Sequence, residues 1–423
     1  MIKSFFLFFL FWSALIFCDQ PIFHVYYTCK SDPSKSIQLN VQSSVAEKIT
    51  VELIQDDQFI QKETSQGILF SLPEQSRYLH HIMFDSLLPK TVYTVVIKAG
   101  ETVLGSSKFE TLSSHLEEIT FVIGGDLEII HEADKILQQM AKSNPDIILF
   151  GGDYPKDVYS LSDYKKWDDW LTKTTETLVK KNGCQIPWIM AIGNNEVFGS
   201  FYQPVENAPF FHAYFPQNDR KRHYFDLFIA SSLHLLVLDS GLTATHDGEQ
   251  KEWLKKTLEE NIKTPLKMAI YHVPIYPSVR FKEKNWYYRL AHAMSRLKKQ
   301  RNIGSRLLSK PSMEGYTHWA PIFDEYKFLL AFEHHEHTFK RTHPIHGGKV
   351  NHQQGTYYLG DGALAPFPRY SPIQKFIDFR LKKSIGHVQF FWLMTFSKDL
   401  IHFKAITSYG KPIDQFSIKG SYE

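Results

Sequence analysis

Two similar stretches decide the fold class of this chain: ITFVIGGD at residues 119–126 and DIILFGGDY at residues 146–154. Each is a short apolar run that ends in Gly-Gly-Asp. Continuous apolar runs of this length are typical of strands buried on both faces, as in a parallel sheet. Between the two stretches, Ile136, Leu137 and Met140 recur at helical spacing. This succession of strand, loop, helix and strand predicts a layered core of helices and sheet.

The same alternation of apolar run and polar loop continues toward the C-terminus. The later runs occupy residues 188–192, 233–238, 268–271 and 328–332, and each is followed closely by Asn, Asp or His. The carboxyl ends of parallel strands meet at one edge of a sheet, where loops carry the polar groups that do chemistry. We therefore expect the polar residues after these strands to lie close together.

Residues 23–112 show a different pattern, in which short alternating runs are separated by polar turns, for example at 37–41, 49–54, 78–84 and 93–97. Alternation with a period of two is typical of half-buried strands. An all-β domain is therefore expected before the layered core.

The segment LLPKTVY at residues 87–93 lies within this all-β part. It looks like the fibronectin type III signature, in which a Tyr at a strand corner caps a turn of backbone with its hydroxyl group. The alternative is an ordinary hairpin with a Pro turn.

The first residues have the pattern of a secretory signal peptide, with Lys3, an apolar run from Phe5 to Phe17 and a polar exit after Cys18. A membrane-spanning helix is the alternative, but it needs roughly 20 apolar residues. A lipid anchor on Cys18 is disfavoured because Phe17 is bulky. We expect residues 1–18 to be removed, which predicts a secreted, periplasmic or lumenal protein with no transmembrane span.

The composition excludes several classes of protein. With 423 residues, 43% of them hydrophobic, the chain can bury a full-sized core and is neither disordered nor fibrous. A net charge of +3 gives no argument for a nucleic-acid partner, and none is expected. After removal of the signal peptide, Cys29 and Cys184 are the remaining thiols, which either pair or stay free.

Six polar residues that follow the apolar runs form a set of metal-binding side chains. They are Asp126, Asp153, Asn194, His272, His335 and His337. Each alone has an ordinary explanation as a turn residue or a core histidine. Together, carboxylate, amide and imidazole groups suit borderline metal ions, and one shared Asp is enough to join two ions. A two-metal centre polarises a phosphoryl oxygen and lowers the pKa of bound water to about 7. The set therefore predicts hydrolysis of phosphoesters.

With these motifs the sequence resembles the calcineurin-like metallophosphoesterases, which carry GD, GD, GNH(E/D), H and GHxH in this order. An all-β domain before that core is similar to the arrangement of purple acid phosphatases. The matching segments are IGGD (123–126), LFGGDY (149–154), AIGNNEV (191–197), LDSG (238–241), IYHVPIYPS (270–278), FEHHEHTFKRT (332–342) and YLGDGALAP (358–366).

The resemblance implies an α+β fold. An N-terminal all-β, fibronectin III-like sandwich over residues 19–113 would precede a four-layer α/β/β/α metallophosphoesterase domain over residues 117–418. It also implies a division of the ligands, with Asp126 and His337 on a first metal ion, Asp153 between the ions, and Asn194, His272 and His335 on a second. The implied cofactors are two metal ions, chosen from Fe, Zn and Mn.

The function that follows is a secreted, dimetal-dependent phosphoesterase of the acid phosphatase type. It would hydrolyse phosphomonoesters of small molecules or proteins, with metal-bound hydroxide as the nucleophile. The alternatives are a phosphodiesterase and a degenerate, weakly active or inactive phosphatase fold that works as a binding module.

Two departures from the family concern the first metal ion. The family has an iron-binding Tyr three residues after the bridging Asp, and this chain has Lys156 there. A cation cannot bind a metal ion, which predicts an atypical, colourless centre. Glu128 lies two residues after Asp126 and points to the same side in an extended segment, so it is a candidate replacement ligand. The alternative is that Glu128 is the solvated start of the next helix.

Three other positions also differ. Asn195 stands where the family has a His that protonates the leaving group, and an amide has no such proton to give. Slow turnover of poor leaving groups is therefore expected. His334 replaces the Gly of GHxH and is a bystander, a substitute for the absent imidazole or a source of crowding. Asn195, Arg280 and Lys156 are the candidates for orienting phosphate, and Arg280 begins a basic segment that extends to Lys310.

Overall fold

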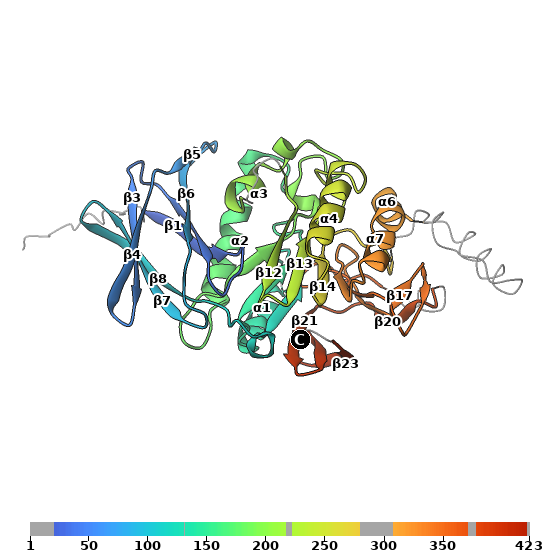
Figure 1. Cartoon of the computed structure of the whole chain (residues 1–423). Helices are drawn as coiled ribbons and strands as arrows, with labels where there is room; N and C mark the ends of the chain where they lie inside the picture. The colour runs from blue at the N-terminus through green and yellow to red at the C-terminus, as the bar shows by residue number, and fades with distance from the viewer. Residues whose placement is uncertain (1–20, 131, 217–221, 280–307, 371–377, 421–423) are drawn as a thin grey trace, which may run out of the picture.

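The computed structural model describes residues 21–130, 132–216, 222–279, 308–370 and 378–420. An N-terminal β-sandwich, blue to cyan in Figure 1, lies at one end of the molecule. Helices α6 (Lys310–His318) and α7 (Ala320–Glu325) lie toward the other end. Two sheets form the centre of the region between them.

The first central sheet is built on three parallel strands, β9 (Phe121–Gly124), β10 (Ile147–Phe150) and β11 (Trp188–Met190). Antiparallel strands extend it beyond β9, namely β21 (Phe390–Ser397), β22 (Leu400–Thr407) and β23 (Pro412–Lys419). Alternate residues of β9 face opposite layers. Ile123 packs in the core between the two sheets, and Val122 packs toward the helices.

The second central sheet contains four parallel strands in its middle, which are β13 (Leu233–Val237), β14 (Leu266–Ile270), β15 (Leu330–Phe332) and β19 (Tyr357–Gly360). Antiparallel strands complete it, namely β12 (Phe225–Ile229), β16 (Phe339–Thr342) and β20 (Leu381–Ile385). Strands β17 (Ile345–His346) and β18 (Lys349–Val350) form a separate small hairpin.

Helices cover the outer faces of both sheets. Helices α1 (Ala133–Lys142) and α2 (Tyr164–Thr177) pack on the first sheet, and α4 (Glu249–Glu260), α6 and α7 pack on the second. In α1, the side chains of Ile136, Leu137 and Met140 are buried, as their spacing predicted. The four-layer α/β/β/α order is therefore confirmed.

The N-terminal part is an all-β sandwich, also as predicted. One sheet holds β1 (Ile22–Thr28), β2 (Ile37–Ser43), β6 (Arg77–Phe84) and β5 (Ile68–Phe70). The other holds β4 (Gln58–Ser65), β3 (Ile49–Gln55), β7 (Val92–Ala99) and β8 (Thr102–Glu110). The hydroxyl of Tyr93 accepts a hydrogen bond from the backbone N–H of Leu88 at 2.9 Å, which is the corner contact expected from LLPKTVY.

The sandwich and the core share one sheet, which the sequence pattern did not predict. Strand β1 pairs in parallel with β11, with Thr28 opposite Trp188, and this pair joins a ten-stranded sheet. A buried guanidinium strengthens the junction, because Arg77 of β6 forms an ion pair with Asp168 of α2 at 2.6 Å. The two parts therefore pack as one body along this sheet.

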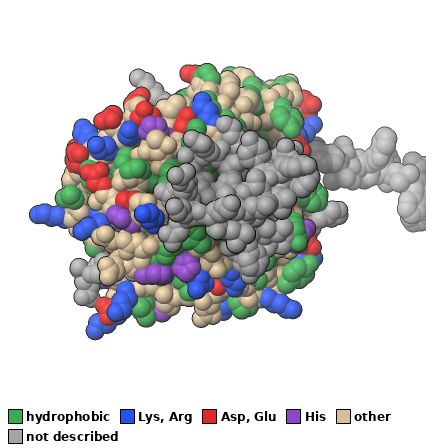
Figure 2. Space-filling view, turned by 90° about the vertical axis from the view of Figure 1, so that its right-hand side faces the viewer, with side chains coloured by type: hydrophobic (Ala, Val, Ile, Leu, Met, Phe, Trp, Pro, Cys, Tyr) green, Lys and Arg blue, Asp and Glu red, His purple; other side chains and the backbone are tan. Residues whose placement is uncertain are grey.

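The structure bears on the predictions about the cysteines and about membrane-spanning segments. Cys29 and Cys184 are both buried and free, so they do not pair with each other. Within the described ranges, no helix is long and apolar enough to cross a membrane. The predicted signal peptide, residues 1–18, and Arg280 lie outside the described residues. On the face shown in Figure 2, acidic and basic side chains of the described residues are intermixed.

Acid is expected to weaken the fold through His223. Its imidazole is buried beside Phe211, and burial, with a smaller effect of the charge on His212, lowers its pKa from 6.5 to about 3. The unfolded chain therefore binds a proton that the folded chain rejects, and the stability tied to neutral His223 is complete above pH 6.5 and lost as the pH falls toward 3.

Urea unfolding at about pH 7 and about pH 4.5 measures this effect, which is worth roughly 2 kcal/mol. The His223→Gln variant should lose less stability than the natural chain between the two pH values. An equal loss in both proteins would show that His223 is not the responsible group.

Candidate metal centre

The predicted ligands lie in loops after strands of both central sheets. Asp126 and Asp153 follow β9 and β10, and Asn194 opens a short turn after β11. His272 follows β14 and His335 follows β15 in the facing sheet. The carboxyl ends of the two sets of parallel strands therefore meet at one edge of the sheet pair, as the sequence predicted.

Four polar side chains form a compact group that we call the second position, comprising Asp153, Asn194, His272 and His335. The Nδ1–H of His272 donates to the carbonyl of Gly151 at 3.0 Å, so Nε2 is the ring nitrogen that faces the other ligands. This Nε2 lies 3.1 Å from Nδ1 of His335, 3.2 Å from Oδ1 of Asn194 and 3.3 Å from Oδ2 of Asp153. When Nε2 is unprotonated, these atoms can all serve as ligands, and these residue types suit a transition metal ion.

The charges at the second position also favour a cation. Burial opposes protonation of His272, but the neighbouring Asp153 outweighs burial and raises the pKa of His272 to about 9. In turn, His272 holds the pKa of Asp153 below its ordinary value although the carboxylate is buried. Protonated His272 is thus the positive partner of the Asp153 carboxylate when no metal ion is bound, and a metal ion would take the place of the proton on Nε2.

Asp126 and His337 form a second pair of candidate ligands, the first position. Oδ2 of Asp126 accepts from the backbone N–H of His335 at 3.0 Å. Its Oδ1 is buried without a hydrogen-bond donor among the described residues and lies 3.0 Å from Nε2 of His337. Because Nδ1 of His337 lies 3.3 Å from the carbonyl of Phe367 and donates to it, Nε2 presents its lone pair toward Asp126. The pair also fits a cation.

Glu128 and Lys156 bind each other at the first position. Nζ of Lys156 donates to Oε2 of Glu128 at 2.8 Å. Burial raises the pKa of Glu128, and Lys156 and His337 oppose this shift. The interpretation of Glu128 as a solvated helix start is wrong, because its side chain is buried and α1 begins only at Ala133. The sequence analysis proposed Glu128 as a metal ligand and Lys156 as a phosphate-orienting group. The ion pair means that a change in one of these side chains affects the other.

Asn195 lies beside the second position and orients its ligands. Its backbone N–H donates to Oδ1 of Asp153 at 2.8 Å. The amide of Asn194 donates to Oδ1 of Asn195 at 3.2 Å, which turns Oδ1 of Asn194 toward His272. Asn195 therefore holds two ligands in place in addition to its predicted role toward phosphate.

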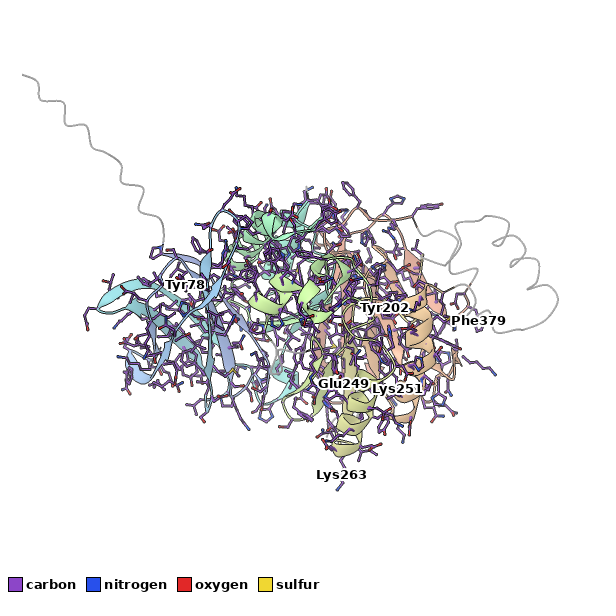
Figure 3. The ribbon with its side chains drawn as sticks, turned by 90° about the horizontal axis from the view of Figure 1, so that it is seen from above. Tyr78, Tyr202, Glu249, Lys251, Lys263 and Phe379 are labelled. Atoms are coloured by element: carbon purple, nitrogen blue, oxygen red, sulfur yellow. The ribbon has the colours of Figure 1, made fainter. Side chains whose placement is uncertain are left out.

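An aromatic loop forms one wall of the second position. The ring of Phe201 meets His335 edge to face at 6.0 Å. The next residue, Tyr202, is labelled in Figure 3, where it lies toward the middle of the molecule. Its hydroxyl donates to the carboxylate of Glu314 in α6 at 3.0 Å. The loop is thereby tied to the helical layer of the second sheet.

The backbone at four predicted ligands is left-handed. The φ angles are +58° at Asp126, +56° at Asp153, +77° at His335 and +58° at His337. For residues other than Gly, this conformation costs of the order of 1–3 kcal/mol each, and it persists where the surrounding structure imposes it. These turns aim the side chains back across the ends of the sheets.

His334 fills a space that two glycines provide. An added Cβ at Gly151 would lie 1.8 Å from Cδ2 of His334, and one at Gly125 would lie 2.7 Å from its Nδ1. The ring is buried, and burial lowers its pKa well below the ordinary value. The extra side chain at the GHxH motif is therefore a packing group between the two Gly-Gly-Asp turns.

Glu196 is a supporting residue that the sequence analysis did not assign. Its Oε2 accepts from the backbone N–H groups of Gly193 at 2.7 Å and Asp153 at 2.9 Å, and its Oε1 accepts from that of Tyr154 at 2.8 Å. The buried carboxylate thus joins the loops after β10 and β11. An acid in the first turn after Gly-Asn-Asn was the available signal in the sequence.

Replacing Glu196 by Gln should loosen the second position. Gln keeps one acceptor oxygen, but its amide nitrogen cannot accept a hydrogen bond. At least one of the three backbone N–H groups therefore loses its acceptor. We expect metal affinity to fall about 10- to 100-fold, as for other partners that orient ligands. Equilibrium dialysis with Zn²⁺ measures it. The Glu206→Gln variant, in the turn at Val205–Asn207, is the matched control, and equal affinity in both variants would contradict the role.

The fit between His334 and Gly151 predicts a compensating pair of substitutions. Gly151→Ala should lower the free energy of unfolding by about 1–3 kcal/mol through overpacking. Adding His334→Gly should recover most of that loss. The control is Gly105→Ala, whose added Cβ would meet only Ile22 at 3.4 Å. Additive losses in the double variant would show that the two residues do not share the space.

The comparisons with known proteins agree with this geometry. Residues 119–304 match the model of the family described as calcineurin-like phosphoesterase. A curated relative, phosphoenolpyruvate phosphatase of Allium cepa, is 25% identical over 308 residues, which are 69% of this chain. The match spans 56% of the onion protein, so this chain corresponds to little more than half of its length.

Two solved structures have the same fold over nearly the whole chain. A purple acid phosphatase from seeds of yellow lupin (Lupinus luteus) has a TM-score of 0.75 and 16% identity, covering 94% of this chain and 74% of the other. The structure of PhoD has a TM-score of 0.71 and 12% identity, covering 96% and 92%. Residues 119–304 therefore match a calcineurin-like phosphoesterase domain, and the fold of the chain, with its all-β part, is similar to the folds of these two structures.

Proposed function

We propose that this protein is a metal-dependent hydrolase of phosphomonoesters. The observation that carries the proposal is the second position, where a carboxylate, an amide oxygen and another imidazole converge on Nε2 of His272. Asp126 and His337 would hold a further ion, with Asp153 between the two positions. Metal ions bound there supply Lewis acidity toward a phosphoryl oxygen and acidify water.

The residues around the ligands provide positioning. Asn195 keeps its amide nitrogen for a phosphate oxygen while its carbonyl oxygen accepts from Asn194. A neutral amide has no proton to give to a departing oxygen, so substrates whose leaving group is stable as an anion are favoured. Aryl and enol phosphates have such leaving groups. The onion relative is named a phosphoenolpyruvate phosphatase, which supports this substrate class because phosphoenolpyruvate is an enol phosphate.

Export is part of the proposal. The N-terminal pattern of Lys3, an apolar run and a polar exit supports a secreted, periplasmic or lumenal enzyme. The competing proposal is a degenerate phosphatase fold that acts as a binding module, in which the ligand set is retained without turnover.

The test measures metal content and hydrolysis on the same purified protein. We expect bound transition metal and turnover of p-nitrophenyl phosphate, with slower turnover of an alkyl phosphate. Asp153→Asn should reduce both metal content and rate, the rate by more than roughly 100-fold, which exceeds the effect of an orienting partner. Asp56→Asn, in an exposed turn of the sandwich, is the control. Metal without turnover of any phosphoester would favour the binding module.

A further inference from the structure

Beside the first position, the buried carboxylate of Glu128 forms an ion pair with Lys156. The side chain of Glu128 is 3% exposed and that of Lys156 is 37% exposed, and their ion pair measures 2.8 Å. Glu128 lies two residues after Asp126, and it is close enough to His337 for the two to interact electrostatically. The ammonium group of Lys156 is therefore placed at the edge of the first position.

Phe367 contacts both Lys156 and a first-position ligand. Its ring lies 5.5 Å from the ammonium group of Lys156, within the range of a cation–π contact. Its carbonyl accepts from Nδ1 of His337, one of the two first-position ligands. The same residue thus contacts both Lys156 and a ligand, so the ammonium group and the ligand pair are held together.

The consequence for metal binding is electrostatic. A divalent ion at the first position has to approach the ammonium group of Lys156, and like charges repel more strongly at a partly buried site than in bulk water. Glu128, a further carboxylate beside the first position, is already neutralised by Lys156. The second position lacks this arrangement, since Asp153 there faces His272 and the N–H of Asn195. The net charges of the two positions are therefore alike, and the difference between them is the ammonium group held beside the first one.

We propose that the Lys156–Glu128 ion pair makes the first position a weak, exchangeable metal site, so that the protein keeps one ion tightly at the second position and takes up another only at higher metal concentration. This inference rests on the proposed function, because it concerns the same centre. It assigns Lys156 and Glu128 a positioning role in controlling metal occupancy.

Metal content after dialysis tests the proposal without any substrate. The natural chain is dialysed against buffers of rising free Mn²⁺ or Zn²⁺ and analysed by mass spectrometry of the dissolved protein. We expect two separate steps of uptake. Lys156→Gln leaves Glu128 as a buried carboxylate without its cation, so it should shift the weaker step to about 10- to 100-fold lower metal concentration, the scale of effects from orienting partners. Glu128 would then be available as a ligand.

Two control variants separate charge from general damage. Lys156→Arg keeps the cation and should keep the weak step, whereas Lys166→Gln removes a lysine that pairs with Asp163 outside the centre and should change nothing. Because Lys156→Gln is destabilised until metal binds, its unfolding temperature should also rise more on metal addition than that of the natural chain.

The outcomes distinguish this inference from the proposed function. Two ions bound with equal affinity by the natural chain, or no shift in Lys156→Gln, would overturn the inference and leave the phosphoesterase proposal intact. Failure of the natural chain to bind any transition metal would overturn both.

Discussion

The centre depends on one physical constraint: the Asp153 carboxylate and the polar atoms around it are brought together from two sheets and need a positive charge among them. Donation from Nδ1 of His272 to Gly151 directs Nε2 toward Asp153 and Asn194. Burial lowers the pKa of His272 but Asp153 raises it to about 9, so a proton on Nε2 supplies this charge when no metal ion is bound, and a metal ion would take the place of that proton. The carbonyl of a Gly-Gly-Asp turn therefore decides that this group of residues is a candidate ligand set.

The surrounding fold stabilises an unfavourable backbone conformation at the ligands. The left-handed backbone at Asp126, Asp153, His335 and His337 is unfavourable in isolation. Hydrogen bonds hold it in place: Glu196 accepts from the backbone N–H of Asp153, and the N–H groups of Asp126, His335 and His337 donate to Gly152, Asp126 and Asp361. The packed core between the sheets keeps the strand ends at a constant separation. Rigid strands and strained loops together aim the ligands.

The departures from the family pattern are coupled to their surroundings. The charge of Lys156 is neutralised by Glu128, and its ammonium group makes a cation–π contact with the ring of Phe367. His334 does not crowd the ligands, because Gly125 and Gly151 leave room for its ring. Asn195 lacks the proton of a histidine but orients Asn194 and Asp153. Each substituted residue makes specific contacts with its neighbours. Such contacts favour a modified metal centre over a centre that has decayed.

The sequence by itself determined the elements and the kind of chemistry, because apolar periodicity and the polarity of strand ends are local properties. The runs ending at Phe150 and Phe332, the helical face of α1 and the ligand types all follow from the order of residues. Tertiary structure decided what depends on distances between remote segments. The pairing of β1 with β11, the contact of Lys156 with Glu128, and the fit of His334 over Gly151 each join parts of the chain that no local pattern relates. The first two contacts form when strands of the first sheet pair, and the third forms when the two sheets pack on each other.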